Sequence, residues 1–218
     1  MSDMKKIVEQ FKKLDTTSVS DALDKLGITG GLLGIKPVCQ GTTLCGQAFT
    51  VHYAPCGEVK GTVGDFLDDV EEGQVVVLDN GGRLNCTVWG DLMSITATRN
   101  KVAGTVIDGV CRDVPAIRDI RYPIFTRDVY MVTGKDRVYV DAVNVPVSVS
   151  GVQVKPGDIM LADDTGVLVI PVGRAAEILE VALNIAEKEK FIEEKIRGGA
   201  TLREARAASG YHSLQTRA

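Results

Sequence analysis

The sequence predicts an α/β fold: a layered sandwich of mixed β-sheet flanked by helices, with a long helix near its C-terminal end. Three observations lead to this class. Strand-like apolar runs alternate with short helical patterns over residues 46–128, which is typical of parallel strands joined by helices. Valines alternate with polar or small residues over 140–154, which indicates half-exposed antiparallel strands. Helical spacing over 174–197 indicates the long helix.

Length and charge narrow the class of protein. With 218 residues, 44% of them hydrophobic, the chain can bury a substantial core, and we expect one domain over residues 1–218. The formal net charge of -4 comes from 25 basic and 29 acidic residues, and no block of lysines and arginines stands out. Such a chain has no basic surface to attract a phosphate backbone, so nucleic acid is not an expected ligand.

The distribution of apolar residues and of cysteines indicates the cellular compartment in which the protein works. The charged start, MSDMKKIVEQFKK, lacks the apolar centre of a secretory signal, and no run of about 18 apolar residues suits a membrane span. We therefore expect a cytoplasmic protein without a membrane partner. The five cysteines form an odd set without a C-x-x-C pair, which argues against a zinc site and against a disulfide framework. They are expected to be reduced, mostly buried thiols.

The N-terminal third begins with two predicted helices. Residues 4–14 have helical spacing, and the segment TTSVSDALDKLG follows with Ser18 and Asp21 in a capping-box arrangement and Gly27 as terminator. The glycine-rich GGLLG at 30–34 has no preceding strand and does not match G-x-G-x-x-G, so an ordinary loop is favoured over a nucleotide site.

The remaining elements follow from alternation and glycine turns. Strands are predicted at 46–53, 74–82, 104–108 and 122–128, with short helices at 64–73, 91–100 and 114–120 between them. Antiparallel structure over 140–154 turns at Ser150-Gly151, and a second strand pair occupies 155–172. The long helix over 174–197 is stopped by Gly198-Gly199, and a short helix begins near Thr201.

Gly90 and Asp91 stand at a predicted strand-to-helix junction. The first N–H groups of a helix lack intrahelical partners and attract anions such as carboxylates. A glycine there lets a ligand approach the backbone closely. The alternative is that Asp91 is simply the N-cap of its helix.

Arg112 and Asp113 follow the next predicted strand, at the edge where open α/β sheets bind ligands. The guanidinium suits a carboxylate or an enolate oxygen, and the carboxylate is a hard ligand for a divalent cation. The twenty residues between Asp91 and Arg112 are enough for one helix and one strand, so both ends could return to the same edge. The alternative is a surface ion pair or a helix cap.

Glu189 occupies an apolar position of the long helix. Ile178, Ala182, Ile185, Glu189 and Ile192 recur at steps of four and three, which puts the glutamate on the apolar stripe. A carboxylate buried there without a partner would cost several kcal/mol. It is therefore either a ligand of some partner or a residue at the rim of a partly exposed helix.

Taken together, these segments resemble a known family. The combination of SVSDAL, GQAFTV, GDLM, GVCRD and GDIMLADDTGVLVIP with the terminal helix is similar to the RraA-like family across nearly the whole chain. Its catalytic members are class II, metal-dependent pyruvate aldolases acting on 4-hydroxy-4-methyl-2-oxoglutarate and 4-carboxy-4-hydroxy-2-oxoadipate. The resemblance implies a swivelling-domain-like α/β sandwich assembled as a homotrimer or homohexamer.

The resemblance also implies roles for charged residues. Arg112 would hold the pyruvyl oxygen and stabilise the enolate formed when the C–C bond breaks, and Asp113 would carry Mg²⁺ or Mn²⁺. Oxaloacetate decarboxylation passes through the same enolate and is an expected side activity. In the family a glutamate of the neighbouring subunit lies beside the metal, and Glu189 is the candidate here, with Glu187 as the second choice. The active site would then lie between subunits.

The helix start after Gly90 is implied to bind the substrate carboxylate. Backbone amides near Gly90, Leu92 and Met93 would hold it, and Asp91 would position a water molecule for proton transfer. The substrate class is therefore a small 2-oxo acid.

Two features decide how much of the family's chemistry can be expected of this chain. The family commonly has an acidic residue three positions beyond the metal-binding aspartate, where this chain has Ala116. The family also includes a regulator that inhibits RNase E by protein contact, and regulators of that branch lack the aspartate after the arginine. Because this chain retains Asp91 and Asp113, the enzyme is favoured over the regulator.

His52 and His212 match no catalytic position, and His52 is expected to be packed or hydrogen-bonded.

Overall fold

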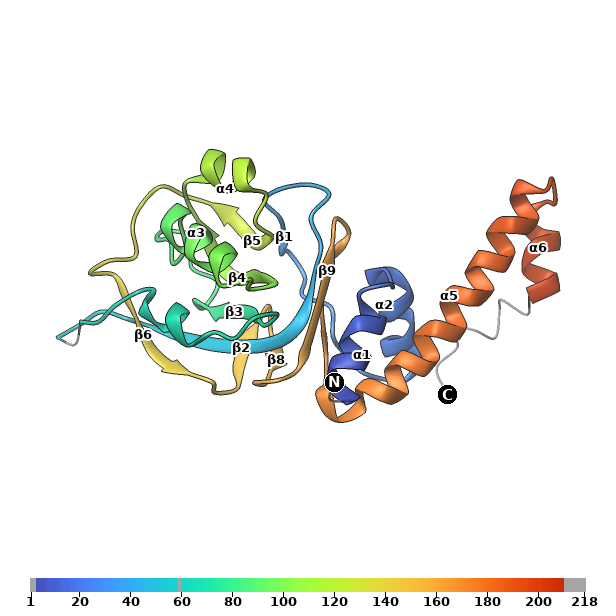
Figure 1. The fold of residues 1–218 in the computed structure, drawn as a ribbon, viewed down its shortest axis with the longest axis horizontal. Coiled ribbons are helices and arrows are strands. Elements are labelled where there is room, and N and C mark those ends of the chain that lie inside the picture. Colours follow the sequence, from blue (N-terminus) through green and yellow to red (C-terminus); the bar gives the residue numbers. More distant parts are fainter. Residues whose placement is uncertain (1–2, 59, 210–218) are drawn as a thin grey trace.

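The computed structural model describes residues 3–58 and 60–209. It has a body built on a β-sheet and a helical region from which the longest helix projects (Figure 1). The helices are α1 (Asp3–Phe11), α2 (Thr16–Lys25), α3 (Asp91–Arg99), α4 (Val114–Ile120), α5 (Ala175–Arg197) and α6 (Leu202–Ser209), with 3-10 helices η1 (Asp65–Asp69) and η2 (Val172–Arg174). The strands are β1 (Lys36–Pro37), β2 (Leu44–Pro55), β3 (Val75–Asp79), β4 (Gly104–Cys111), β5 (Ile124–Val129), β6 (Val138–Val143), β7 (Val147–Val149), β8 (Val152–Val154), β9 (Ile159–Asp163) and β10 (Gly166–Ile170). His212 lies outside the described residues.

The main sheet is mixed, as the sequence predicts, and the structure shows that it is also nearly closed. Its strand order is β1-β5-β4-β3-β2-β9-β10, and β6 pairs with β2 off this path. Strands β2, β3, β4 and β5 run parallel, whereas β9, β10, β6 and β1 pair antiparallel. The fold class, the flanking helices and the long helix after β10 are thereby confirmed.

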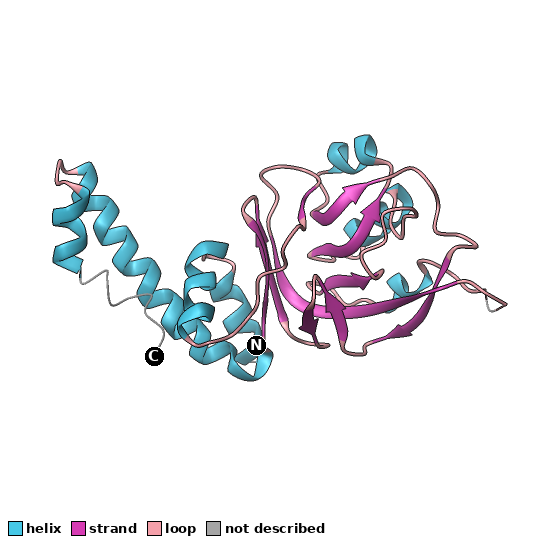
Figure 2. Ribbon diagram, turned by 180° about the vertical axis from the view of Figure 1, so that it is seen from behind, coloured by secondary structure: helices cyan, strands magenta, loops and turns pink. Residues whose placement is uncertain are grey.

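Strand β2 accounts for the curvature. Its 44–47 segment pairs with β9, while 51–55 pairs with β6 with a register shift between His52 and Tyr53. Its middle, 48–52, pairs with β3. One strand therefore serves three partners, and its bend carries the sheet around the interior (Figure 2). The strand predicted over 46–53 extends to 44–55, because its first residues pair with β9 and its last residues pair with β6.

Other differences from the predicted elements have local causes. The predicted short helix at 64–73 is reduced to the five-residue 3-10 helix η1, whose Phe66 and Leu67 are buried. The region 140–154 divides, because β6 joins the main sheet while β7 and β8 form a separate hairpin. Its turn is the predicted Ser150-Gly151, where both residues have positive φ, 51° and 78°. The two-residue β1 was not predicted.

The core divides into layers by the two-residue period of the strands. All five residues of β3 and all eight of β4 are buried. From β3, Val76 and Leu78 pack with α3, α4 and η1, whereas Val75 and Val77 face the β7–β8 hairpin. Helices and hairpin thus cover opposite faces of the parallel strands, whose carboxyl ends support the candidate site.

The helical region forms a separate layer. Phe11 of α1, Leu23 of α2 and Ile178 of α5 pack on the β9–β10 pair. The end of α5 projects beyond this layer, and α6 folds back beside it (Figures 1 and 2). Among residues 3–58 and 60–209, no helix combines the length and the apolar character needed to cross a bilayer.

The cysteines agree with the sequence prediction. All five are free, and four are buried. Burial raises the pKa of Cys45 and of Cys111 to about 12, so these thiols are protonated at neutral pH.

Candidate active site

The site is built on one continuous unit, β3–α3–β4–α4. After β3 the chain passes through a glycine turn to Gly90, whose extended backbone caps α3. Strand β4 then ends at Cys111, so Arg112 and Asp113 follow at its carboxyl end. Asp113 is the N-cap of α4 and has left-handed backbone angles of φ 58° and ψ 35°. Aspartate and asparagine tolerate this conformation better than most residues.

The two ends of the unit meet. Arg112 Nε lies 3.3 Å from Asp113 Oδ2. The backbone N–H of Asp91 donates to the same Oδ2 at 3.3 Å. Residues separated by a helix and a strand in the sequence thus share one carboxylate oxygen, which confirms that Asp91, Arg112 and Asp113 gather in one place.

Gly90 is required by this close approach. A Cβ atom at Gly90 would lie 2.6 Å from Asp113 Oδ2 and 3.4 Å from Arg112 Nε. The first distance is below any ordinary contact, so every other residue would displace the carboxylate or the helix start. Gly90 therefore acts through its missing side chain.

Arg112 stands between two cavities. One has a volume of about 390 Å³ and is lined by Gly61–Val63, Thr87–Met93, Arg112 and Thr133–Lys135. The other, of about 380 Å³, is lined by Arg112, Asp113, Val114 and Val129–Met131. The predicted residues Gly90, Asp91, Leu92, Met93 and Arg112 all line the first cavity, and Asp113 lines the second.

The start of α3 faces the first cavity. Gly90 occupies the N-cap position and Asp91 is the first helical residue, so the alternative that Asp91 is the N-cap is wrong. The Asp91 carboxylate accepts the N–H of Leu92 at 2.7 Å. The N–H of Leu92 therefore already has a carboxylate acceptor, in agreement with the preference for negative charge at the start of a helix.

Arg112 and Asp113 were alternatively expected to form a surface ion pair or a helix cap. They do form a partly exposed ion pair, and Asp113 is the N-cap of α4. Their side chains are 42% and 36% exposed. What goes beyond an ordinary pair is the contact with the Asp91 amide and the two cavities on either side.

The donor set can be compared with the needs of Mg²⁺ or Mn²⁺. No group of three or more His, Cys, Asp or Glu side chains suited to a metal occurs among the residues that the structure describes. A closed protein cage, as in structural zinc sites, is therefore not formed there. One partly exposed carboxylate, that of Asp113, leaves coordination positions for water and substrate. This arrangement fits Mg²⁺, which keeps several waters and binds through one or two carboxylates.

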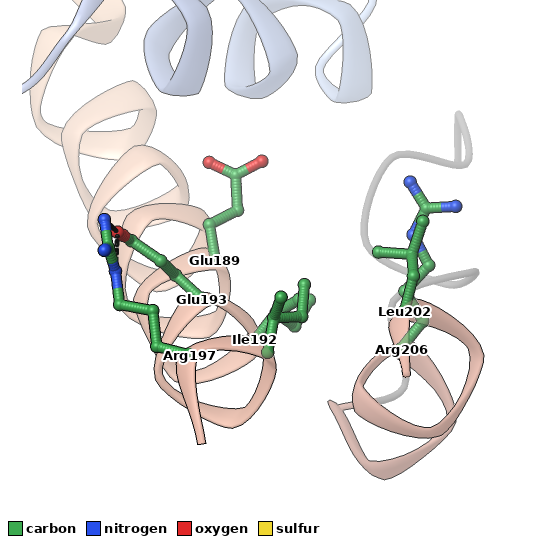
Figure 3. Close-up of a pocket in the computed structure, with 7 residues that line it drawn as sticks. Glu189, Ile192, Glu193, Arg197, Leu202 and Arg206 are labelled. Carbon is green, nitrogen blue, oxygen red and sulfur yellow. Dashed lines mark hydrogen bonds and ion pairs between the residues drawn. The ribbon is translucent and has the colours of Figure 1, made fainter. Parts of the chain in front are cut away.

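Glu189 lies elsewhere in the chain. It belongs to α5, on the opposite side of β9 from α3 (Figure 1), and borders a cavity of about 510 Å³ between α5 and α6 (Figure 3). Its carboxylate points toward α2, where Ser18 Oγ lies at 3.5 Å. Burial, together with the negative charges of Asp21 and Asp15, raises its pKa. Glu187 is exposed.

Within one chain, Glu189 thus has no contact with the Arg112 site. A role there requires a second copy and stays a prediction. Its surroundings agree with the periodicity, however, because the carboxylate is half-buried on the side of α5 that carries Ile185 and Ile192.

Some cavity residues were missed. Thr62, Thr133 and Lys135 come from loops after β2 and β5 that approach α3 only because the sheet closes. No local pattern marks them in the sequence. His52 is expected to be packed or hydrogen-bonded. Its Nδ1 lies 3.2 Å from Oδ2 of Asp141, which confirms the hydrogen bond.

The structure is thus an α/β fold in which the start of α3 lies beside the Arg112–Asp113 pair and borders a cavity. The chain belongs to the RraA-like family: the family described as "RraA-like: Aldolase/RraA" matches residues 16–169. The resemblance inferred from the sequence is thereby confirmed.

Two curated relatives differ in their extent. The chain is 44% identical over 207 residues to "Protein DlpA" of Legionella pneumophila, covering 93% of this chain and 34% of that protein. It therefore spans about a third of the length of that relative. It is 34% identical over 175 residues to the "Putative 4-hydroxy-4-methyl-2-oxoglutarate aldolase" of Halalkalibacterium halodurans, covering 80% of this chain and 81% of that protein.

Two solved structures are similar over most of the chain. An uncharacterized protein from Pseudomonas syringae pv. tomato matches with a TM-score of 0.88 and 42% identity, covering 93% of this chain and 97% of that one. Streptomyces coelicolor RraAS2, described as an unusual member of the RNase ES inhibitor RraA protein family, matches with a TM-score of 0.77 and 29% identity. That match covers 85% of this chain and 94% of the other.

Proposed function

We propose that this chain is a divalent-metal-dependent pyruvate aldolase. It cleaves 4-hydroxy-4-methyl-2-oxoglutarate or 4-carboxy-4-hydroxy-2-oxoadipate to pyruvate and a second 2-oxo acid, and it decarboxylates oxaloacetate as a side activity. The observation that carries the proposal is the meeting of Arg112, Asp113 and the Asp91 amide at the start of α3. The name of the Halalkalibacterium halodurans relative supports the same class of reaction.

The reaction needs a place for negative charge. In the cleavage, the 4-hydroxyl loses its proton, the C3–C4 bond breaks, and its electron pair remains on the pyruvyl half as an enolate. A proton added at C3 then gives pyruvate. The Arg112 guanidinium stabilises the enolate oxygen, because a fixed positive group beside developing charge lowers the barrier.

The helix start orients the substrate. The amides of Leu92 and Met93 border the same cavity as Arg112 and bind the substrate carboxylate, for which the Asp91 carboxylate gives up the Leu92 N–H. Freed in this way, Asp91 positions the water that carries the proton. Oxaloacetate would bind by the same pyruvyl end, and loss of its distal carboxylate as CO₂ leaves the same enolate.

Asp113 would hold the metal, as Mg²⁺ or Mn²⁺. When bound, the ion would act as a Lewis acid that polarises the carbonyl group of the 2-oxo acid. Position 116 is an alanine and offers no second carboxylate, so within one chain Asp113 would be the single protein ligand and the remaining positions would be left to water, substrate and a second copy of the chain.

The direct test is turnover. Purified protein with Mg²⁺ or Mn²⁺ is incubated with 4-hydroxy-4-methyl-2-oxoglutarate or oxaloacetate, and pyruvate release is coupled to lactate dehydrogenase. We expect metal-dependent turnover that Arg112→Ala abolishes. Turnover indifferent to EDTA would rule out the metal mechanism.

The site is completed by a second copy, in a homotrimer or homohexamer that brings Glu189 beside Asp113. Glu187 is the second choice. Mixing subunits tests this directly: Arg112→Ala and Glu189→Gln proteins, each inactive alone, should regain part of the activity when reassembled together. If Arg112 and Glu189 act in the same chain, no mixture can contain an intact site.

A second candidate function is regulation of RNase E by protein contact. It is favoured by one observation, the structural similarity to Streptomyces coelicolor RraAS2. A pull-down with purified RNase E discriminates between the two functions, because the aldolase needs no such partner. Binding at micromolar concentration without pyruvate release would favour the regulator.

A further inference from the structure

Two buried side chains next to the site, Trp89 and Ser94, have no role in the proposed function so far, although Trp89 also lines the first cavity. Trp89 is the single tryptophan of the chain and is 2% exposed, and Ser94 is fully buried. The indole Nε1–H donates to Ser94 Oγ at 2.8 Å. The Ser94 hydroxyl in turn donates to the carbonyl oxygen of Gly90 at 2.9 Å. One hydroxyl therefore joins the indole to the peptide at the start of α3.

The backbone of Trp89 reaches the other half of the site. Its carbonyl oxygen accepts the backbone N–H of Arg112 at 3.0 Å and the Thr87 hydroxyl at 3.0 Å. The indole is stacked on Tyr122, with ring centroids 6.0 Å apart and 4° between the planes. The hydroxyl of Tyr122 lies 3.0 Å from that of Thr105 on β4. Trp89 is thus held in the core and contacts both ends of the unit.

The geometry of one peptide bond explains the consequence. The peptide between Gly90 and Asp91 is trans and planar, so its C=O and N–H point in opposite directions. The carbonyl oxygen accepts the Ser94 hydroxyl at 2.9 Å in addition to the helical backbone N–H of Ser94 at 3.1 Å. The N–H on the other side donates to Asp113 Oδ2. Rotating the peptide would therefore break the bonds on both sides together, and the hydroxyl adds to the hold that the helix backbone already provides.

We infer that Trp89 and Ser94 form a brace that positions the active site. The brace sets the plane of the Gly90–Asp91 peptide and, through the Trp89 carbonyl, the backbone of Arg112. Both side chains act through the backbone of Gly90, Asp91 and Arg112, so both are positioning residues. The catalytic consequence rests on the proposed aldolase function, whereas the positional consequence does not.

The kinetic test uses variants matched in chemistry. Ser94→Ala removes the hydroxyl, and we expect kcat for pyruvate release to fall about 10- to 100-fold, because small displacements of reacting groups cost rates of this order. KM should change less than about three-fold. Trp89→Phe removes the N–H but keeps the stacked ring, and the double variant should lose little more than Ser94→Ala alone, because both changes break one chain of bonds.

The chain offers a control and a rescue. The Thr98 hydroxyl donates to the Ser94 carbonyl oxygen at 2.8 Å, which is the same bond one turn further along α3. Thr98→Ala should keep kcat within about three-fold of the wild type, because it leaves Gly90 untouched. Ser94→Thr keeps the hydroxyl and should retain activity, as threonines already make this bond in α3.

A readout without turnover separates the brace from the reaction. In ¹H–¹⁵N spectra of the full chain, the single indole N–H should be protected from solvent exchange, and Ser94→Ala should abolish that protection. The same variant should shift the amide signals of Asp91 and Arg112, while Thr98→Ala leaves them in place. Unchanged signals at both amides in Ser94→Ala and in Trp89→Phe would overturn the brace, whether or not the protein cleaves the substrate. Shifted amides in a protein without turnover would sustain the brace and count against the aldolase alone.

Discussion

Two regions of this protein carry its candidate functional acids in opposite ways. In the β3–α3–β4–α4 unit, Asp113 shares one carboxylate oxygen with the Arg112 guanidinium and the Asp91 amide. In the helical region, Glu189 of α5 faces Ser18 and two further acids, Asp15 and Asp21. The first acid has a cationic partner within its chain, whereas the second has two acids near it, although Arg197 and Arg206 line the same cavity as Glu189.

The difference shows which part of a site one chain can complete. The Asp113 carboxylate is held by a guanidinium and a backbone amide of its own chain, so it is ordered before any ligand arrives. A half-buried carboxylate among acids has its ionised form opposed. Glu189 thus gains from a cationic partner, and a metal held by Asp113 of another copy is such a partner.

The largest effect is expected for Arg112. Arg112→Ala removes the only guanidinium that borders both cavities among the described residues, and kcat should fall about 10³-fold, as for loss of a main charge-stabilising group. Arg112→Lys keeps the charge but not the planar fork, and it should recover only part of the loss. Coupled pyruvate release measures both variants. Equal activity of the wild type and Arg112→Ala would place the chemistry elsewhere.

Asp113 comes next, and its backbone dictates the variant. Because Asp113 has positive φ, Asp113→Asn keeps a residue that tolerates this conformation, while alanine would add strain. We expect about a 100-fold loss of turnover together with weaker Mn²⁺ binding, because the charged ligand is lost. Titration calorimetry with Mn²⁺ and the coupled assay test the two parts separately. Unaltered metal affinity would remove Asp113 as the ligand.

Gly90→Ala is expected to have a smaller effect of the same kind. The new Cβ would lie 2.6 Å from Asp113 Oδ2, so the carboxylate must move and kcat should fall about 10- to 100-fold. Gly166→Ala is the matched control, because a Cβ there meets nothing within 4 Å and its φ is not positive. Similar losses in both variants would show that general destabilisation, and not the close approach, explains the result.

These three residues belong to the part of the molecule that the sequence predicted well. The unit from Gly90 to Asp113 is local, so a helix and a strand of predicted length sufficed to bring its ends together. The bend of β2 was not predicted, because it depends on pairing with β9 and β6, strands far away in the sequence. The loop residues Thr62 and Lys135 were missed for the same reason.

Glu189 shows the limit of periodicity. The spacing of apolar residues correctly put this glutamate on the packed side of α5, where it is half-buried. A pattern within one helix reports which side is covered but not which group covers it. The acids of α2 and its N-cap that surround Glu189 come from a segment about 170 residues earlier, and no local signal links the two.

The last prediction concerns stability and not turnover: Glu189→Gln should change the free energy of unfolding of the isolated chain only slightly, and the sign of that change tests the comparison of the two acids. Burial and the charges of Asp21 and Asp15 raise the pKa of Glu189 in the folded chain above its unfolded value of 4.5. The folded state is therefore most favoured when Glu189 is protonated, and this stability is lost as the pH rises through the raised pKa.

For the isolated chain, the glutamine should thus raise the free energy of unfolding at pH 7 by less than about 1 kcal/mol, since the carboxylate is partly solvated. At pH 4 the gain should vanish. Urea unfolding at the two pH values measures it, with Glu187→Gln as the exposed control on the same helix. If a second copy supplies a cation at Glu189, the sign reverses: the assembled Glu189→Gln protein is less stable at pH 7 than the wild type, and dilution to single chains restores the gain.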